Sequence, residues 1–466
     1  MKVLKFGGTS VGTPESLACV KRIVEAASEN QQLIVVVSAL GGITDQLINT
    51  ARLASQGDMR YLQLYASIVA RHLDVVEAVV IEEFKAKTKV RINSLLEELG
   101  NIFCAINLLR DLSQRTLDMV VSFGERMSSI IISRMIADAK YLYSPDFIIT
   151  RQQFGKHILD NEETTLRVHE CIDSLDFKVA IAPGFISTDR NGDITNLGRG
   201  GSDYTAAILA AIMKADILEI WTDVDGFMTA DPRIIKNAFV MDSMTFPEAM
   251  ELCNFGAKVI YPPTLYPVYH RNIPIVVKNT FNAEAKGTLI SPNNAPAASS
   301  IKGISSVKEV GLISITEGVE ADKPAIDERI FNALAQNGIS IYMMTDTRMP
   351  DIPELDYSRP SRQIAVKGDD LKRTREILAK EFSKELRNRV LGNIRSIDGL
   401  SLVAAVGSNI QANGSLLDSL LTSLAGNKLP VVTHNNLASD TNISIVTRAE
   451  ALTDALRTIH DAIFAG

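Results

Sequence analysis

The chain has 466 residues, of which 46% are hydrophobic and 22% are charged, and its formal net charge is −7. These values are typical of a globular protein long enough for two or three domains with cores of their own. The acidic balance and the lack of a basic cluster argue against nucleic acid as a partner, and no apolar run approaches the roughly 20 residues that cross a bilayer.

The cysteines and the N-terminus bear on the cellular compartment. No two cysteines have the C-x-x-C spacing of a redox or zinc motif, and each lies among apolar residues, so reduced core thiols are favoured over disulfides or a zinc site. The chain enters a strand at once, without the charged and then apolar segments of a signal peptide. We therefore expect a cytoplasmic protein with free thiols at Cys19, Cys104, Cys171 and Cys253.

Short apolar strands alternate with helices through the first 290 residues. After a strand at 3–6, the expected strands are rich in β-branched residues, as in strands buried on both faces, and cover 33–37, 179–182, 217–221 and 273–278. The expected helices cover 14–28, 46–53, a long run at 73–109, 127–139 and 204–214. This alternation predicts an α/β sandwich with a mainly parallel sheet, whose ligands bind beyond the carboxyl ends of the strands.

A duplicated pattern comes after residues 291–300, which have few large apolar side chains and are expected to form a linker. One strand begins at Gly311 and another at Gly399, and the helices after them end at Gly338 and Gly426, with the same separation. Each unit continues with two strands and a closing helix. The sequence therefore predicts two tandem βαββα units.

Two adjacent glycines follow the first strand, in the segment KFGGTSVG at 5–12. Gly7 and Gly8 allow backbone N–H groups to approach a ligand without interference from a Cβ atom, and the helix start at Thr13-Pro14 favours anions. Lys5 adds a point charge suited to a phosphate. The segment is not a P-loop, because it lacks G-x-x-x-x-G-K-[ST], and at this point a plain tight turn is an equal alternative.

Two further segments combine glycine with polar side chains. SALGGITD at 38–45 has hydroxyls at both ends of a Gly-Gly turn, which suits a small polar ligand, although Thr44 also fits a simple helix cap. SFGERMS at 122–128 places Glu125 at the expected start of an apolar helix, where a carboxylate usually only complements the helix dipole.

The segment LGRGGSDY at 197–204 surrounds Arg199 with glycines. A guanidinium in a flexible glycine loop has little to pack against, so a carboxylate or phosphate partner is the favoured interpretation. Ser202 and Asp203 also fit the role of cap for the next helix.

Polar groups come after a later strand in WTDVDG at 221–226 and in ADPR at 230–233. They suit a nucleotide base and ribose, but a β-turn at Asp225-Gly226 needs no ligand. FGAKVI at 255–260 supplies Lys258 from an apolar helix, where a lysine is normally a solvated residue. Together these segments suit a site for a phosphate and a zwitterion, and the lack of G-x-G-x-x-G after any strand argues against a dinucleotide dehydrogenase.

In their order and spacing these segments resemble the aspartate kinases of the amino acid kinase family, over essentially the whole first 290 residues. The tandem units resemble paired ACT regulatory domains. The resemblance implies an α/β protein, an amino acid kinase three-layer sandwich with a mainly parallel sheet, followed by two ferredoxin-like βαββα (ACT) units. It implies a catalytic domain at 1–290, a linker at 291–307 and ACT-like units at 308–385 and 386–466, with residues near 301–307 adding a strand to the second unit.

The implied reaction is ATP-dependent phosphorylation of the β-carboxylate of L-aspartate to 4-phospho-L-aspartate, with Mg²⁺ accompanying ATP and no metal ligand from the protein. Arg199 would hold the α-carboxylate of aspartate and Glu125 its α-ammonium group, while Asp203 would orient the catalytic Lys5. The remaining implied contacts are Ser38, Thr44 and Ser202 for aspartate, Lys5, Gly7, Gly8, Thr9, Ser10 and Lys258 for the phosphate, and Thr222, Asp223, Met228 and Arg233 for the nucleotide.

The chain departs from the family pattern at several positions. Met228 stands where an aromatic residue is common, so thioether packing is expected to replace stacking on adenine, and Tyr261 stands where a histidine is usual. The loop at 346–362 is atypical, and of the regulatory half we suggest only residues 343–346 as lying near an effector interface.

Alternative functions are a kinase for another amino acid such as glutamate, and a catalytically inactive amino-acid sensor. A bifunctional kinase–homoserine dehydrogenase is not expected, because the sequence ends soon after the second unit. We expect feedback inhibition by lysine first or threonine second. Because ACT-like units expose strand edges, we also expect a homodimer or higher oligomer.

Overall fold

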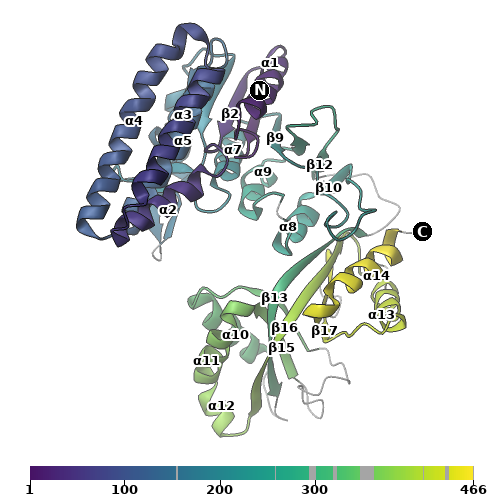
Figure 1. Ribbon diagram of the computed structural model, residues 1–466. Helices are drawn as coiled ribbons and strands as arrows, with labels where there is room; N and C mark the ends of the chain where they lie inside the picture. The colour runs from purple at the N-terminus through teal and green to yellow at the C-terminus, as the bar shows by residue number, and fades with distance from the viewer. Residues whose placement is uncertain are drawn as a thin grey trace. The chain divides into compact units, whose positions relative to one another are not determined.

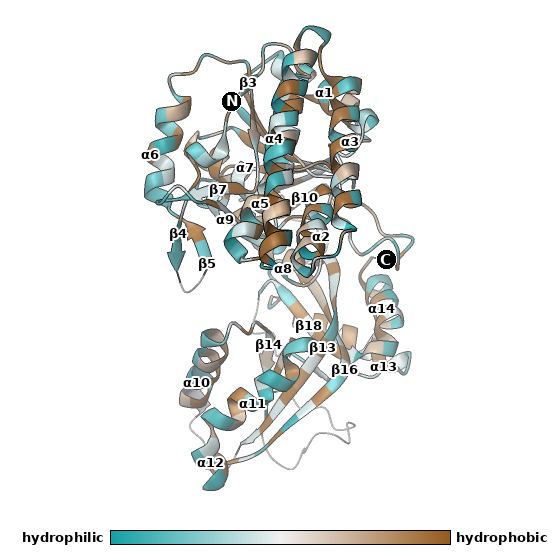
Figure 2. Cartoon of the chain, turned by 60° about the vertical axis from the view of Figure 1, so that its left-hand side comes forward, coloured by the Kyte–Doolittle hydropathy of each residue, from teal (hydrophilic) through white to brown (hydrophobic). Residues whose placement is uncertain are grey.

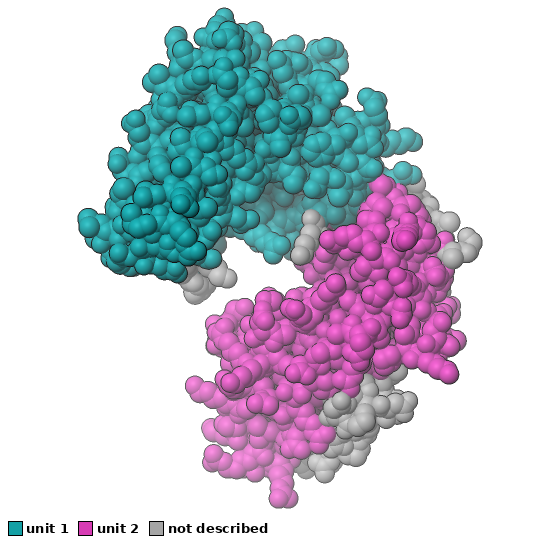
Figure 3. Space-filling view, in the orientation of Figure 1, with its two compact units in different colours: residues 1–227, 242–246, 259–294 teal, residues 228–241, 247–258, 295–466 magenta. Residues whose placement is uncertain are grey.

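The computed structural model describes residues 1–153, 156–257, 259–292, 301–317, 323–346, 361–412, 414–435 and 440–464. These residues fall into two compact units, which Figure 3 colours separately. Unit 1 comprises Met1–Phe227, Asp242–Phe246 and Val259–Asn294, and unit 2 comprises Met228–Met241, Pro247–Lys258 and Ala295–Gly466.

An eight-stranded sheet forms the centre of unit 1. Its strands are β1 (Lys2–Phe6), β2 (Leu33–Val37), β3 (Lys140–Tyr141), β6 (Val179–Pro183), β9 (Ile217–Thr222), β10 (Ser243–Thr245), β11 (Ile275–Asn279) and β12 (Thr288–Ser291). Their order is β10-β12-β11-β9-β1-β2-β6-β3, and every pairing is parallel except that of β11 with β12. The mainly parallel sheet is thus confirmed. β2 is buried along its whole length, which explains its continuous run of branched residues.

Helices cover both faces of this sheet. On one face, the helices α1 to α5 share a core with alternate residues of β1 and β2, including Leu4, Phe6 and Val35 (Figure 1). On the other face, α7 packs against β1, β2 and β9 and contacts α9. The helices of this half of the chain are α1 (Pro14–Ser28), α2 (Ile43–Gln56), α3 (Tyr61–Val79), α4 (Glu82–Leu109), α5 (Gln114–Ser133), α6 (Asn161–Ile172), α7 (Gly201–Ile212), α8 (Phe246–Asn254) and α9 (Leu265–Tyr269).

The single long helix expected over 73–109 is wrong, because α3 and α4 are separate helices. Val80 and Ile81 between them have extended backbone, with ψ of 137° and 134°. Neither glycine nor proline marks the break. Apolar residues continue through it because Val80 is buried in the same core as both helices, so the helical pattern shows no interruption.

The helix α5 begins at Gln114, well before the expected residue 127, with Ser113 accepting a hydrogen bond from the Thr116 N–H at 3.2 Å. Glu125 therefore lies in the middle of α5, and its placement in a first helical turn was wrong. Nearly every residue of α5 from 120 onward is buried, so the amphipathic pattern that would have revealed the helix is missing.

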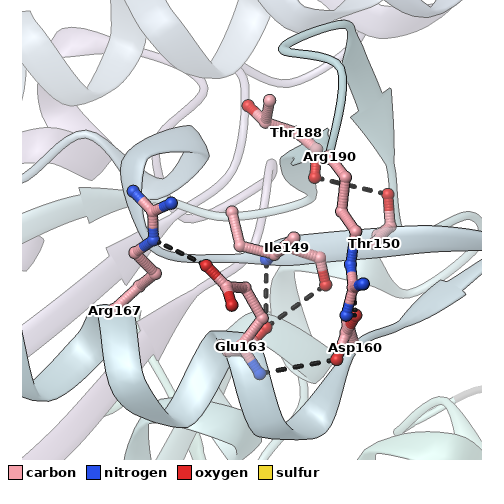
Figure 4. A network of polar contacts seen from close by, with 8 residues as sticks. Ile149, Thr150, Asp160, Glu163, Arg167, Thr188 and Arg190 are labelled. Atoms are coloured by element: carbon pink, nitrogen blue, oxygen red, sulfur yellow. Dashed lines mark hydrogen bonds and ion pairs between the residues drawn. The ribbon is translucent and has the colours of Figure 1, made fainter.

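A second, four-stranded sheet in unit 1 has the order β5-β4-β7-β8 and adjoins α6. Asp160 accepts a hydrogen bond from the Glu163 N–H at the start of α6 and another from Arg190 Nε at 3.0 Å (Figure 4). α6 itself is mostly hydrophilic (Figure 2), in keeping with its exposed outer face. The strands are β4 (Ile149–Gln153), β5 (Lys156–Leu159), β7 (Ile186–Asp189) and β8 (Ile194–Asn196).

A six-stranded antiparallel sheet forms the centre of unit 2, in the order β14-β15-β13-β16-β18-β17. The order of elements along the chain is strand, helix, strand, strand, helix, given twice, which confirms the two βαββα units. The strands are β13 (Ile301–Glu317), β14 (Ile341–Thr345), β15 (Ser361–Lys367), β16 (Leu391–Gly407), β17 (Thr433–His434) and β18 (Asn442–Arg448). The helices are α10 (Lys323–Gln336), α11 (Leu371–Glu381), α12 (Ser383–Arg387), α13 (Leu416–Gly426) and α14 (Leu452–Phe464).

The two βαββα units exchange strand segments through the long strands β13 and β16, of 17 residues each (Figure 1). The first half of β13, Ile301–Val307, pairs with the end of β16, as expected for 301–307. The second half of β13 pairs with β15, and it is joined there by the first part of β16. Each repeat therefore completes its sheet with a segment from the other.

Within the described residues, none of the helices combines the length and the apolarity needed to cross a membrane.

Candidate functional site

The loops after β1 and β2 meet at the carboxyl edge of the large sheet. The strand register sets Phe6 opposite both Val37 and Trp221. The carboxyl ends of β1, β2 and β9 therefore lie side by side at one edge of the sheet. A Cβ atom on Gly41 would lie 2.8 Å from the Gly8 carbonyl oxygen. The two glycine loops can approach this closely because Gly41 carries no side chain.

Lys5 points from the end of β1 toward the start of α7, where its ammonium group lies 2.6 Å from Asp203 Oδ1. Both side chains are largely buried, with 11% and 13% of their surface exposed. A Cβ atom on Gly7 would lie 3.4 Å from Lys5 Nζ, so the ammonium group lies beside the glycine loop. The fold thus brings Asp203 next to Lys5 and the glycine turn at Gly7, although Asp203 is far from both in the sequence.

The helix α7 begins at Gly201, directly after Gly200 with φ of 68°, and no side chain caps it. Ser202 and Asp203 are therefore inside the first turn, and the alternative that one of them caps the helix is wrong. Ser202 is buried against Gly184 at the end of β6, where a Cβ atom would lie 2.6 Å from the Ser202 Cβ. This contact holds the start of α7 at the same sheet edge.

Glu125 is buried and reaches the loop after β2 from α5. Burial raises its pKa to about 8, against the opposing effect of a hydrogen bond from the Ala39 N–H. Its Oε2 atom has no hydrogen-bond partner among the described residues. Such a carboxylate is suited to a cationic partner, because an ammonium group would compensate for the lost solvation.

The loop after β2 is fixed to α5 from a second direction. Ser128 donates a hydrogen bond to the Ser38 carbonyl oxygen at 2.7 Å. Gly42, with φ of 81°, occupies the N-cap of α2, so the alternative role of Thr44 as the cap is wrong. Thr44 instead lies in the first turn and is half-buried, as is Ser38.

Arg199 lies on the loop that leads into α7 and is exposed. In the part of the chain that the structure describes, it forms no ion pair, and glycines with positive φ stand on both sides of it. Tyr261 packs closely on this loop: a Cβ atom on Gly200 would lie 2.2 Å from the Tyr261 Cβ. The loop is thus fixed at one end while its guanidinium group stays available.

The two hydroxyls of the first loop differ. Ser10 is buried and shares a 2.7 Å hydrogen bond with Thr280, which follows β11, while Thr9 is exposed. Thr280 and Tyr261 were both missed as candidates, because each acts through a contact with a residue far away in the sequence. No local motif marks Thr280, and Tyr261 stood out only as a departure from the usual histidine after FGAKVI.

The predicted nucleotide residues are divided between the two units. In unit 1, Thr222 ends β9 and donates a hydrogen bond to the exposed Asp223 at 3.2 Å. In unit 2, Met228 is half-buried, and the exposed Arg233 forms an ion pair with Asp231 at 2.7 Å. Lys258 and most of the 346–362 loop lie outside the described residues. Among the described residues, no group of three or more His, Cys, Asp or Glu side chains could hold a metal ion.

Comparison with known proteins gives a consistent result. The model of the amino acid kinase family matches residues 1–279. The bifunctional aspartokinase/homoserine dehydrogenase of Buchnera aphidicola is 29% identical over all of this chain and 56% of its own length. The chain spans about half the length of the bifunctional curated relatives that it matches.

Two solved structures of E. coli aspartokinase III are also similar over the whole chain. One contains aspartate and ADP, with 25% identity and a TM-score of 0.83 over 100% of both chains. The other contains lysine and aspartate, with 26% identity and a TM-score of 0.72 over 100% of this chain and 99% of that one. The sequence match over most of the chain, with the sheet and the glycine loops that carry it, places this protein in the amino acid kinase family.

Proposed function

We propose that this chain is an aspartate kinase, which transfers the γ-phosphate of ATP to the β-carboxylate of L-aspartate. The observation that carries the proposal is the buried Lys5–Asp203 pair beside two touching glycine loops, together with Glu125 of α5, whose carboxylate reaches the loop after β2 and forms no ion pair among the described residues. The aspartokinase relatives and the E. coli structure with aspartate and ADP support it.

The chemistry asks for positive charge rather than for a base. The β-carboxylate of aspartate has a reference pKa near ~3.9, so it is already ionised at neutral pH. It must approach an anionic phosphate, and positioning with charge neutralisation therefore dominates the barrier. We assign this work to Lys5 and to the N–H groups of Gly7 and Gly8, with Asp203 holding the lysine in place.

The zwitterion aspartate has two further charges that need partners. We assign its α-ammonium group to Glu125 and its α-carboxylate to Arg199, whose guanidinium suits a bidentate carboxylate contact. Ser38, Thr44 and Ser202 supply polar atoms between them. These roles are proposals that rest on the burial and the positions described above.

ATP would bring Mg²⁺, which neutralises phosphate charge when bound. The Asp203 carboxylate beside Lys5 is already in an ion pair. We therefore propose that the ion is held mainly by phosphate oxygens and water, as is common for Mg²⁺. Thr222, Asp223, Met228 and Arg233 are proposed for the nucleotide, and Thr9, Ser10 and Lys258 for its phosphates.

The decisive experiment is an acyl-phosphate assay, with hydroxylamine trapping, on aspartate and glutamate side by side. We expect hydroxamate from aspartate and far less from glutamate. A preference for glutamate would replace the assignment with another amino acid kinase, and absence of ATP turnover with either would favour an inactive sensor.

We further propose that the βαββα units at 308–385 and 386–466 bind an end-product amino acid, lysine before threonine. The E. coli structure with lysine supports the first choice. Calorimetric titration of the full chain with lysine and with threonine tests this proposal. If neither amino acid gives a measurable heat of binding, the proposal is rejected. The catalytic domain is proposed as 1–290 and the linker as 291–307.

We propose a cytoplasmic homodimer or higher oligomer. The four cysteines are free thiols, in keeping with a reducing compartment. Their expected place in the core was wrong, because Cys104 is exposed and the other three are half-buried. The edge strand β14 pairs only with β15 in the described sheet, so its other edge can pair with a second copy. Analytical ultracentrifugation at micromolar concentration should show dimers, and monomers alone would contradict the proposal.

A further inference from the structure

A cavity of about 350 Å³ lies in unit 1 between α4, α5 and β3, away from the glycine loops. Its lining comes from one face of each helix, because residues three or four positions apart lie on the same side. The lining residues are Phe84, Lys87, Thr88, Arg91, Ile130, Ser133, Arg134 and Tyr141. Its volume is within the range of small-molecule sites.

Three cations line this cavity and none of its lining residues is acidic. In the described part of the chain, Lys87, Arg91 and Arg134 form no ion pair, whereas Lys85 and Lys89 on the same helix pair with Glu77. This concentration of positive charge stands out in a chain with a net charge of −7. Unpaired cations around a concave surface form a site for an anion.

The neutral groups of the cavity narrow the class of ligand. Thr88 and Ser133 donate their hydroxyl hydrogens to helix carbonyl oxygens at 2.8 Å, so they offer no donor to a ligand. Burial raises the pKa of Tyr141 to about 12, so its hydroxyl stays neutral and does not cancel the cations. Recognition therefore depends on the two guanidinium groups and one ammonium group, which match a dianionic head better than a single carboxylate.

The apolar lining and an adjoining cavity indicate an organic body on this head. The Arg134 guanidinium lies 5.4 Å from the centre of the Phe84 ring. A second cavity, of about 590 Å³, shares Phe84, Ser133, Arg134 and Tyr141 with the first. It also contains Asp138, Lys140, Asp176 and Lys178, so its charges are nearly balanced. A charged head thus fits the first cavity and a less charged body the second.

We propose that the α4–α5–β3 cavity binds a small phosphate monoester, with the phosphate on Lys87, Arg91 and Arg134 and the organic body along Phe84 and Tyr141. The site is separate from the proposed kinase site and does not depend on that function.

The test is isothermal titration of the full chain with phenyl phosphate, and with inorganic phosphate as the head alone. We expect saturable binding of phenyl phosphate that is tighter than that of inorganic phosphate. The variant Arg91→Gln/Arg134→Gln should weaken it at least about tenfold, as expected for loss of charged hydrogen bonds. Lys87→Gln should weaken it less, because an ammonium group meets a phosphate only as a point charge. Lys87, Arg91 and Arg134 are all exposed, so none of these substitutions is expected to disturb the core.

Two matched controls separate this site from others. Arg22→Gln removes an exposed arginine on α1 that lies outside the cavity. This variant should bind phenyl phosphate as tightly as the unchanged chain. Lys5→Ala removes the proposed catalytic cation, and this variant should also bind phenyl phosphate as tightly as the unchanged chain. Loss of binding in Lys5→Ala, unchanged binding in both cavity variants, or no saturable binding at millimolar concentration would each overturn the proposal.

Discussion

At the scale of single residues, the site depends on charges that the fold places out of water. Lys5 and Asp203 stabilise each other, and a buried charge that loses its partner is costly. Glu125 has no such partner among the described residues, so it is the residue most ready to take one from a ligand.

Lys5→Ala should reduce turnover by several orders of magnitude while the chain stays folded, because the variant removes the charge proposed to stabilise the transferred phosphate. Hydroxamate formation and circular dichroism measured on the same preparation check this. The control is Lys21→Ala, at a half-exposed lysine on α1, which should keep full activity. Near-normal turnover in Lys5→Ala would remove the proposed role.

Glu125 predicts a pH dependence of aspartate binding. Its pKa of about 8 means that it is mostly protonated at neutral pH before the ligand binds. An ammonium group selects the ionised form, so the KM for aspartate should fall as the pH rises from about 6.5 to 8. The same raised pKa lowers the free energy of unfolding as the pH rises from 4.5, the ordinary pKa of a glutamate, to about 8.

The comparison for this prediction is Glu125→Gln, which should bind aspartate weakly and with a KM that varies little over the same range. If the KM of the variant changes with pH as steeply as that of the unchanged chain, a group other than Glu125 causes the pH dependence.

At the scale of elements, the helical layer and the glycine loops are destabilised by different kinds of substitution. α3 and α4 bury apolar faces against each other and against α2 and α5, so a charge placed in these faces would be destabilising. The loop before α7 depends instead on backbone shape, since two of its glycines have positive φ.

His72 on α3 is buried, and burial lowers its pKa from 6.5 to about 4. As the pH falls below 6.5, His72 is protonated in the unfolded chain but stays neutral in the folded chain. The free energy of unfolding therefore decreases between pH 6.5 and about 4. The loss should reach about 2 kcal/mol at about pH 5. Urea unfolding at neutral pH and at about pH 5 measures it, and the variant His72→Met should lack this share of the acid sensitivity.

The glycines on either side of Arg199 offer a matched pair. Gly198→Ala meets open space and should cost only about 1–2 kcal/mol for its left-handed backbone. Gly200→Ala meets the same penalty and also the Cβ atom of Tyr261, so it should shift the loop and raise the KM for aspartate much more. Equal effects on the KM would show that the Tyr261 contact does not position Arg199.

Sequence patterns predicted those elements whose limits are set locally. The helix at 14–28 was predicted to the residue, because Thr13 caps it and Pro14 suits its first turn. α5 was located poorly because burial on all sides removes periodicity. In the site, the contacts of Gly8 with Gly41, Ser10 with Thr280 and Gly200 with Tyr261 join distant segments, and no local signal predicts them.

At the scale of the whole molecule, the C-terminal half contributes to the packing of segments from the first 290 residues. Ala230 and Ile235 share a core with Ile304 and Val403, and the Thr229 carbonyl oxygen accepts a hydrogen bond from the Ile304 N–H at 2.7 Å. On its own, the proposed catalytic domain is therefore expected to be less stable, because Ala230 and Ile235 would lose these packing partners.

A chain shortened to residues 1–290 should be less soluble and melt at a lower temperature than the full chain, because Ala230 and Ile235 lose their apolar surroundings. Size-exclusion chromatography and thermal unfolding of both chains check this. A monodisperse, fully active fragment would contradict it.

The exchange of segments between β13 and β16 also limits how the C-terminal half can be divided. Since each repeat is finished by backbone from the other, recombination that separated them would leave two incomplete sheets with open edges. The smallest piece that gene fusion can transfer intact is consequently the pair.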